Sequence, residues 1–419
     1  MAEESTRDIA PGLLKSVRRR ETFRALHNRN YRLLWIGMVG HSASLWAETV
    51  ARSWLIWQLT GSATLLATVH LLRAIPLLFF GLFAGVAADR FDKRKILIIC
   101  QSFTLINHVV LAVLIITGVV EVWHVLLTTF LSGCSKAFNQ PTRIALIPSL
   151  VREDELTNAV ALNSVAVNIT RIVGPAAAGL LIASLGIGAV YFVAAGVYVI
   201  AIACTIMLRV PPVITRLGKT SVWTDMGEVF QYVYKEKTIL ILVVLALIPL
   251  TVAWPYIALL PIFADTVLDI GAPGLGWLYS AIGVGALLAV IIIATLGRVR
   301  RKGLVVLLGV FCFGAFLMVF SQSTLVPISL VVMAFVGFVS TGSMVLINTS
   351  LLEIAPPELH GRVMGIFRLD HGLMPLGVMV VGVLADAIGV SLTVLIMGSI
   401  CVLLALSMGT RISLVRRVP

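Results

Sequence analysis

The stretch 85-GVAADRFDKRK-95 decides the fold, because it joins two long apolar runs at residues 62–88 and 96–118. Each run is long enough to cross a membrane as a helix, which takes about 20 mainly apolar residues. The stretch between them gathers basic side chains into a short turn, as cytoplasmic loops of membrane proteins do. The sequence therefore predicts a helical hairpin in a membrane, with its turn inside the cell.

Apolar runs of this kind recur along all 419 residues of the chain, which is 59% hydrophobic and only 12% charged. Soluble domains carry about 25% charged residues, so this composition excludes a soluble enzyme or a secreted globular protein. The runs lack the period-two alternation of a membrane β-barrel. We predict an all-α integral membrane protein with twelve transmembrane helices, at residues 33–59, 62–88, 96–118, 122–147, 159–185, 189–208, 239–262, 276–296, 304–320, 328–352, 363–385 and 392–408.

The positions of the basic residues predict how these helices are oriented. Of the 32 lysines and arginines, 26 lie in the two tails and in alternate loops, and the intervening loops hold none. Lysine and arginine are retained on the cytoplasmic side of a membrane, so we expect both termini inside the cell. The net charge of +12 is then explained by basic residues in the cytoplasmic loops and tails. The expected partner is therefore the lipid bilayer rather than a nucleic acid.

An internal repeat predicts two halves. Residues 155–186 match residues 358–389 at a constant offset of 203 in the pairs Glu155/Glu358, Leu156/Leu359, Val160/Val363, Gly174/Gly377, Gly179/Gly382, Leu181/Leu384 and Gly186/Gly389. Parallel six-helix repeats are typical of secondary transporters that bind substrate between the halves. The expected organisation is a tail (1–32), a six-helix bundle (33–208), a linker (209–238), a second bundle (239–408) and a tail (409–419). The linker reads as an amphipathic helix at the membrane interface, with an ordinary loop as the alternative.

The loop at residues 85–95 resembles the signature loop of the major facilitator superfamily, Gly-x-x-x-Asp-Arg-x-Gly-Arg-Arg. The matching residues are Gly85, Asp89, Arg90, Lys93 and Arg94, and Asp92 stands where the family has glycine. The resemblance implies a latch between the halves that stabilises the outward-facing state. Gly85 is expected to permit a close approach between helices at the cytoplasmic end. Arg143, near the inner end of the fourth run, is expected to reach Asp89.

The fifth run carries Gly174, Pro175 and Gly179. This pattern is similar to the Gly-Pro-x-x-Gly-Gly motif of superfamily antiporters, most of which are exporters, although Ala178 replaces one glycine. Proline bends the helix and the glycines allow close packing. The stretches 54-WLIWQLTGS-62, 141-PTRIALIP-148 and 158-NAVALN-163 resemble the enterobactin-exporter and macrolide-efflux-like branch. The span-four arginine of many proton–drug antiporters is absent, since Thr129 occupies that position before Gly133.

Charged side chains inside the apolar runs are costly and therefore candidate functional residues. Glu48 has two possible partners: Arg52, one turn later in the same run, and Lys136 in the fourth run. A carboxylate that exchanges a basic partner for a proton would couple transport to protons, and a purely structural ion pair is the alternative. The candidates for proton coupling or substrate contact are Glu48, Lys136, Asp370, Arg52, Arg73 and Arg368.

The sequence thus predicts a bacterial inner-membrane transporter that exports a small amphiphilic molecule (a drug, siderophore or similar metabolite) in exchange for protons. An importer on the same fold and a non-transporting membrane protein, such as a scramblase or scaffold, are the alternatives. Motifs for nucleotides, metals and chemical catalysis are absent, so we expect no enzymatic activity, no cofactor and no metal. A monomer is expected, and the five cysteines read as packing residues.

Overall fold

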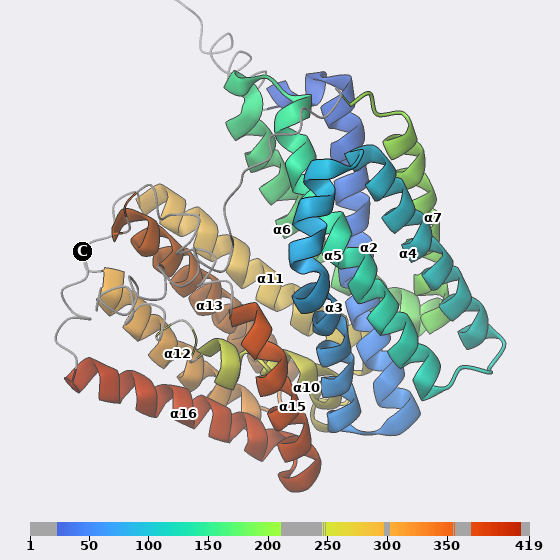
Figure 1. Ribbon diagram of the computed structural model, residues 1–419. Helices are drawn as coiled ribbons and strands as arrows, with labels where there is room; N and C mark the ends of the chain where they lie inside the picture. The colour runs from blue at the N-terminus through green and yellow to red at the C-terminus, as the bar shows by residue number, and fades with distance from the viewer. Residues whose placement is uncertain are drawn as a thin grey trace, which may run out of the picture.

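The computed structural model describes residues 23–210, 245, 247, 249–296, 302–354, 356 and 370–411, and these residues are helical almost throughout (Figure 1). The predicted linker, 209–238, lies outside the described residues except at its first two positions. Two groups of helices make up the molecule, and they meet at one end and spread apart at the other.

The first group contains six long helices and two short 3₁₀ turns. They are η1 (Arg24–His27), α2 (Arg29–Thr60), α3 (Ala63–Arg90), α4 (Lys93–Ile116), α5 (Val122–Leu150), η2 (Glu153–Glu155), α6 (Leu156–Leu185) and α7 (Ile187–Ile206). The second group contains η3 (Pro249–Ala253), α10 (Tyr256–Ile262), η4 (Phe263–Val267), α11 (Gly271–Leu296), α12 (Lys302–Gln322), α13 (Val326–Ile354), α15 (Asp370–Ile388) and α16 (Val390–Arg411). The segments η3 and η4 are π-helical turns on either side of α10.

Each of the twelve predicted spans overlaps helical residues in the described part of the chain. Within that part, nine helices are long and apolar enough to cross a membrane. The helices α2 and α5 fall below this hydropathy because they carry polar and charged residues in their middles, and the described apolar part of α15 is the short helix Met374–Ile388. The number of spans therefore stays a prediction, whereas the helical membrane fold is confirmed.

Local side chains explain where the helices begin and end. The side chain of Asp92 accepts hydrogen bonds from the backbone N–H groups of Arg94 and Lys95 and so begins α4. The departure from the signature loop at Asp92 is thus a helix cap. Gly186 ends α6 with φ +82°, and Gly389 follows α15 with φ +87°. These two glycines are a matched pair of the internal repeat, and both adopt a left-handed conformation that favours glycine.

The other two glycine pairs of the repeat also occupy equivalent places. A Cβ at Gly179 would lie 2.6 Å from the Ala272 oxygen of α11, and one at Gly382 would lie 2.5 Å from the Ala67 Cβ of α3. Both glycines therefore allow one group of helices to approach the other. Gly174 instead packs on α2 and Gly377 on η3, each within its own group.

Contacts between the two groups lie at one end, which we call the closed end. There the Asp386 carboxylate accepts hydrogen bonds from Ser62 Oγ (2.9 Å), the Ala63 N–H (2.7 Å) and the Thr64 N–H (2.9 Å). In the same region Trp57 Nε1 donates to Asp265 at 2.8 Å. A hydrophobic core shared by both groups fills this end, and it includes residues of α2, α3, α6, α10, α11 and α15.

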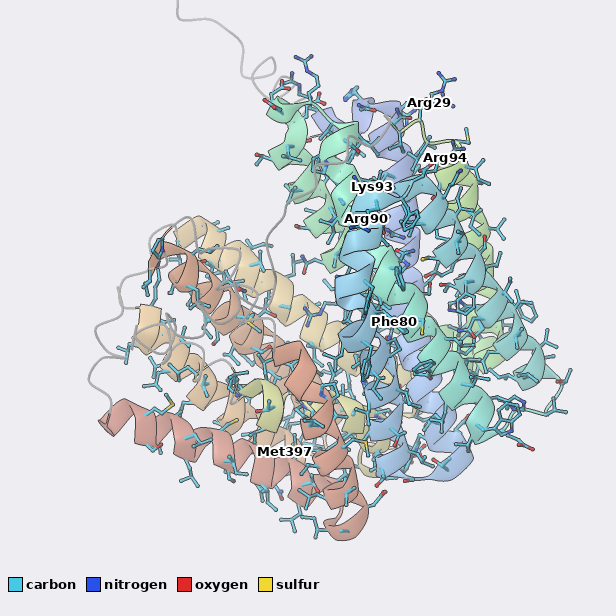
Figure 2. The ribbon with its side chains drawn as sticks, in the orientation of Figure 1. Arg29, Phe80, Arg90, Lys93, Arg94 and Met397 are labelled. Carbon is cyan, nitrogen blue, oxygen red and sulfur yellow. The ribbon has the colours of Figure 1, made fainter. Side chains whose placement is uncertain are left out.

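At the opposite end, which we call the open end, the groups separate. A hydrophobic cluster there contains Tyr31, Leu97, Leu146 and Leu208, and every member belongs to the first group. Figure 1 shows α6 and α11 diverging toward this end. Figure 2 places Arg29, Arg90, Lys93 and Arg94 together at the same end of the first group. The basic loop at residues 85–95 therefore lies at the open end.

Candidate functional site

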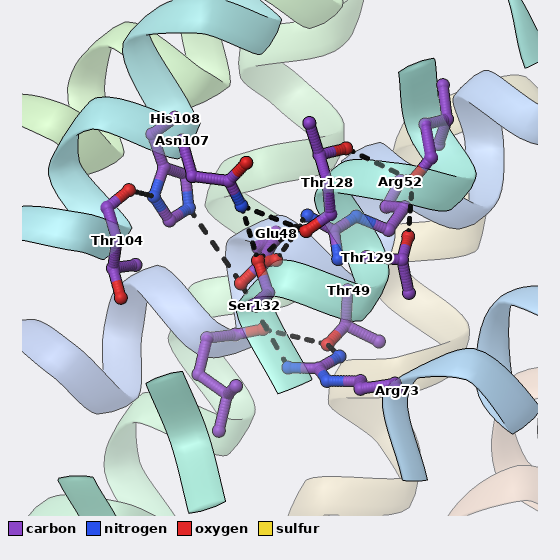
Figure 3. Close-up of polar contacts among 12 residues, drawn as sticks. Glu48, Thr49, Arg52, Arg73, Thr104, Asn107, His108, Thr128, Thr129 and Ser132 are labelled. Carbon is purple, nitrogen blue, oxygen red and sulfur yellow. Dashed lines mark hydrogen bonds and ion pairs between the residues drawn. The ribbon is translucent and has the colours of Figure 1, made fainter. Parts of the chain in front are cut away.

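The side chain of Glu48 forms the centre of a buried charged cluster inside the first group of helices (Figure 3). Its Oε1 lies 2.6 Å from Arg52 Nη2, one helical turn later on α2. Its Oε2 lies 4.0 Å from Arg73 Nη2 on α3 and 3.8 Å from His108 Nε2 on α4. The carboxylate thus faces two guanidinium groups and one imidazole ring from three helices.

Polar side chains around the cluster hold these groups in place. Asn107 Nδ2 donates to Ser132 Oγ at 2.8 Å, and Ser132 Oγ also accepts from Arg52 Nη2 at 3.3 Å. Arg73 Nη1 donates to Thr49 Oγ1 at 3.2 Å. Such networks fix the geometry of buried charges because each unpaired group in an apolar interior is costly.

The hydrogen bonds of His108 define which of its nitrogens faces Glu48. Its Nδ1 lies 2.7 Å from the Thr104 backbone oxygen, and a carbonyl oxygen only accepts, so Nδ1 carries a proton. The other nitrogen, Nε2, faces Glu48. The 3.8 Å between Nε2 and the carboxylate is longer than a hydrogen bond, so the imidazole is a neighbour of Glu48 rather than a direct partner.

The structure thus brings together three of the predicted site residues and separates others from them. Glu48 pairs with Arg52 rather than with Lys136, which is half-buried on α5 and forms no ion pair with any residue in the described ranges. Arg368 lies outside the described residues, and Asp370 is described only as the first residue of α15. His108 belongs to the cluster although no spacing in the sequence links it to Glu48.

The signature loop contacts the end of α7, within the first group of helices, and, among the described residues, does not make the close contact between helices expected at Gly85. Arg94 donates through Nε to the Thr205 oxygen at 3.2 Å and also contacts the Ile206 oxygen. Its guanidinium therefore provides hydrogen-bond donors for the free backbone carbonyl groups at the C-terminal end of α7. A Cβ at Gly85 would meet no described atom within 4 Å. The close approach expected at Gly85 is therefore absent from this arrangement, because the two groups of helices are apart at the open end.

The remaining loop residues lie as follows. Arg90 is exposed, and the side chain of Asp89 is not among the described ones. Arg143 is buried, with its Nη1 3.4 Å from the Gly37 oxygen of α2. Its guanidinium therefore points into the first group of helices.

The Gly-Pro segment of α6 forms much of the contact between the groups. Beyond Gly179, the backbone of Pro175 lies against Gly276 of α11, and Ser280 of α11 donates to the Ile172 oxygen. Glycines on both helices, Gly179 on α6 and Gly276 on α11, allow this close packing because they have no side chain. The segment thus forms a packed joint at the closed end.

A cavity of about 260 Å³ lies between the groups beside this joint. Arg171 of α6 lines one side of it. The second group supplies Leu250, Trp254, Ser340, Thr341, Met344, Val345 and Met374. The cavity combines one cationic side chain with a mainly apolar wall, as ligand sites commonly do.

Comparisons with known proteins agree with this fold. The chain is 28% identical to the multidrug efflux pump Tap of Mycolicibacterium fortuitum over 377 residues, which cover 85% of this chain and 90% of that protein. It is 26% identical to macrolide efflux protein A of Streptococcus pyogenes over 379 residues, 88% of this chain and 93% of that protein. The crystal structure of a bacterial homologue of the human lysosomal transporter Spinster, inward-facing and occupied, matches with a TM-score of 0.73 at 14% identity, and the match covers 94% of this chain and 97% of that one.

A family model described as transmembrane secretion effector matches residues 20–417, almost the entire chain. This match and the efflux relatives confirm the resemblance drawn from the signature loop and the Gly-Pro segment. The protein is a multi-pass membrane transporter, and it belongs to the transmembrane secretion effector family of the major facilitator superfamily.

Proposed function

We propose that this transporter exports a small amphiphilic molecule, such as a drug, a siderophore or a similar metabolite, from a bacterial cell in exchange for protons. Export proceeds by alternating access in the inner membrane, with both termini in the cytoplasm. The observation that carries this proposal is that the described parts of the two groups of helices join at one end, beside a cavity between them, and separate at the other.

The charge distribution supports an inward-open state. The basic residues of the 85–95 loop lie at the open end, and positive loops are retained in the cytoplasm. The acids Asp265 and Asp386 lie at the closed end, where they hold the groups together. With this orientation the cavity opens toward the cytoplasm, from which an exporter takes its substrate.

Proton coupling is assigned to Glu48. In the inward-open state its carboxylate is paired with Arg52, as an ionised acid would be. Protonation weakens this pair, so the charge state of Glu48 can change the balance between conformations. Arg73 is the most exposed member of the cluster, with 18% of its side chain accessible against 5% for Glu48. We therefore place proton access on the side of Arg73.

Everted membrane vesicles test this function. A respiring vesicle carries an acidic interior, which a pH-sensitive acridine dye reports. Rhodamine 123 or fluorescein is then added to vesicles that contain the wild-type protein. Part of the gradient should dissipate, because each dye molecule that enters the vesicle is exchanged for protons that leave its interior. The variant Glu48→Gln should lose this response, whereas Glu48→Asp should keep part of it.

Three results would contradict the proposal. The first is that neither dye changes the gradient. The second is dye movement that persists after a protonophore has removed the gradient. The third is a Glu48→Gln variant that responds as the wild type does at equal expression. Uptake of dye into intact cells would instead identify an importer.

A further inference from the structure

Arg171 is a basic side chain that lines the cavity between the two groups of helices. Its guanidinium carbon lies 5.6 Å from the centre of the Trp46 ring, a cation–π contact with α2. No acidic group pairs with Arg171 among the residues that the structure describes. The cavity therefore presents a cation whose charge is not compensated by a described carboxylate.

The wall opposite Arg171 combines hydroxyl groups with apolar side chains. Ser340 and Thr341 supply hydroxyls, while Leu250, Trp254 and Met344 supply apolar surface. A smaller adjoining cavity of about 40 Å³ shares Leu250, Trp254, Ser340 and Met344 and extends to Phe313. The site thus has a cationic group on the side of α6, two hydroxyls on α13, and apolar side chains from η3, α12 and α13.

The charge balance of the first group of helices also leaves an excess of positive charge. Glu48 is the one acid in the middle of its described spans, and Arg52 neutralises it. The basic residues in the same spans are Arg52, Arg73, Lys136, Arg143 and Arg171. Excess positive charge away from water is unfavourable, so an anion bound beside Arg171 would be stabilised and a cation would be repelled.

We propose that this cavity binds an amphiphilic organic anion. One carboxylate, sulfonate or phosphate group contacts Arg171, and the apolar body lies against Trp254, Leu250 and Met344. This inference rests on the proposed transport function and narrows its substrate class. A soluble metabolite and an anionic lipid share this chemistry, and the test separates them.

The test measures binding without any gradient. Purified protein in phosphatidylcholine nanodiscs is titrated into fluorescein, an aromatic anion, or rhodamine 123, a cation of the same ring system, and anisotropy gives each Kd. Wild-type protein should bind fluorescein at least tenfold more tightly than rhodamine 123. Arg171→Gln should weaken fluorescein binding at least tenfold. Arg171→Lys keeps the charge but loses the planar group that stacks on Trp46, so it should weaken binding by less than Arg171→Gln does. Arg152→Gln, at an exposed arginine outside the cavity, is the matched control and should bind as the wild type does.

A second arm replaces fluorescein with dansyl-phosphatidylglycerol. Arg171-dependent binding of this lipid alone identifies a lipid anion, and Arg171-dependent binding of fluorescein identifies a soluble one. The proposal is overturned if rhodamine 123 binds more tightly than both anions, or if Arg171→Gln changes neither anion's Kd by more than twofold. Rhodamine binding that requires Asp370, tested with Asp370→Asn, would overturn it as well. Failure of gradient-driven transport with intact anion binding would instead contradict the proposed function alone.

Discussion

Glu48 is an acid in the middle of the first group of helices: its side chain is only 5% exposed, and it faces two guanidinium groups and one imidazole ring. Burying an ion pair gains little net stability, because desolvation offsets most of the Coulomb attraction. Removing one partner leaves a buried charge uncompensated, which costs about 3–5 kcal/mol. At this scale the cluster is a site where the loss of one charge has a large effect on stability.

A double-mutant cycle tests the pairing of Glu48 with Arg52. Glu48→Ala should lower the thermal unfolding temperature clearly, because it leaves Arg52 and Arg73 unpaired in an apolar interior. Glu48→Ala combined with Arg52→Leu should recover a large part of this loss, since the pair is removed as a unit. The unfolding temperature in one detergent, with and without each substitution, gives the coupling.

The corresponding cycle with Lys136→Leu is the control. Lys136 forms no ion pair with any described residue, so its coupling to Glu48→Ala should be much smaller than that of Arg52→Leu. Coupling to Lys136 and none to Arg52 would mean that the alternative pair is the correct one.

Part of this cluster can be predicted from the sequence. The spacing of Glu48 and Arg52, four residues apart on one helix, predicts their contact directly. Their contacts with Arg73 and His108 depend on how α2, α3 and α4 pack, and no periodicity in one helix encodes that. For the same reason the sequence leaves Glu48 with two possible partners.

Helix contacts between the groups depend on small residues at matched positions of the repeat. Gly179 on α6 and Gly382 on α15 each permit a close approach across the closed end. The sequence reveals these glycines through the repeat, and each pair has the same role in both halves. The sequence does not reveal that Gly85 stays without a close neighbour, because that depends on which end of the molecule is open.

Gly179→Leu should open the closed end. A side chain there meets the Ala272 backbone oxygen at 2.6 Å, and backbone cannot move aside as a flexible side chain does. A cysteine introduced at Ser62, beside the Asp386 contact, should then react faster with a membrane-impermeant maleimide added from outside.

Gly196→Leu is the matched control for this substitution. Gly196 is also a helix glycine, and a Cβ there meets no described atom within 4 Å, so labelling at Ser62 should stay at the wild-type rate. Equal labelling in both glycine variants would show that the α6–α11 joint does not keep this end closed.

The described part of the molecule consists of two similar groups of helices that pack together at the closed end, beside the cavity lined by Arg171. Composition and the repeat predict the helices and their division, because apolar length and duplication are properties of the chain alone. The conformational state is different, since it reflects a balance between arrangements that differ by a few kcal/mol. The position of the cavity beside Arg171 also requires the packed structure.

The central claim is that protonation of Glu48 shifts this molecule between inward-open and outward-open states. The most direct measurement is pulsed electron resonance between spin labels in a cysteine-free background. One pair, at Val160 and Leu296, reports the open end, and another, at Leu185 and Asp269, reports the closed end; all four residues are exposed.

At pH 8 the first pair should show mainly the long distance and the second pair mainly the short one. The ion pair with Arg52 favours the ionised carboxylate, so lowering the pH to 5.5 should favour an arrangement in which this pair is broken and Glu48 is protonated. The population of the present arrangement should therefore fall, with the first distance shortening as the second lengthens. Glu48→Gln should show no response to pH. Distances that stay fixed, change in the same direction, or respond to pH in Glu48→Gln as in the wild type would contradict the account.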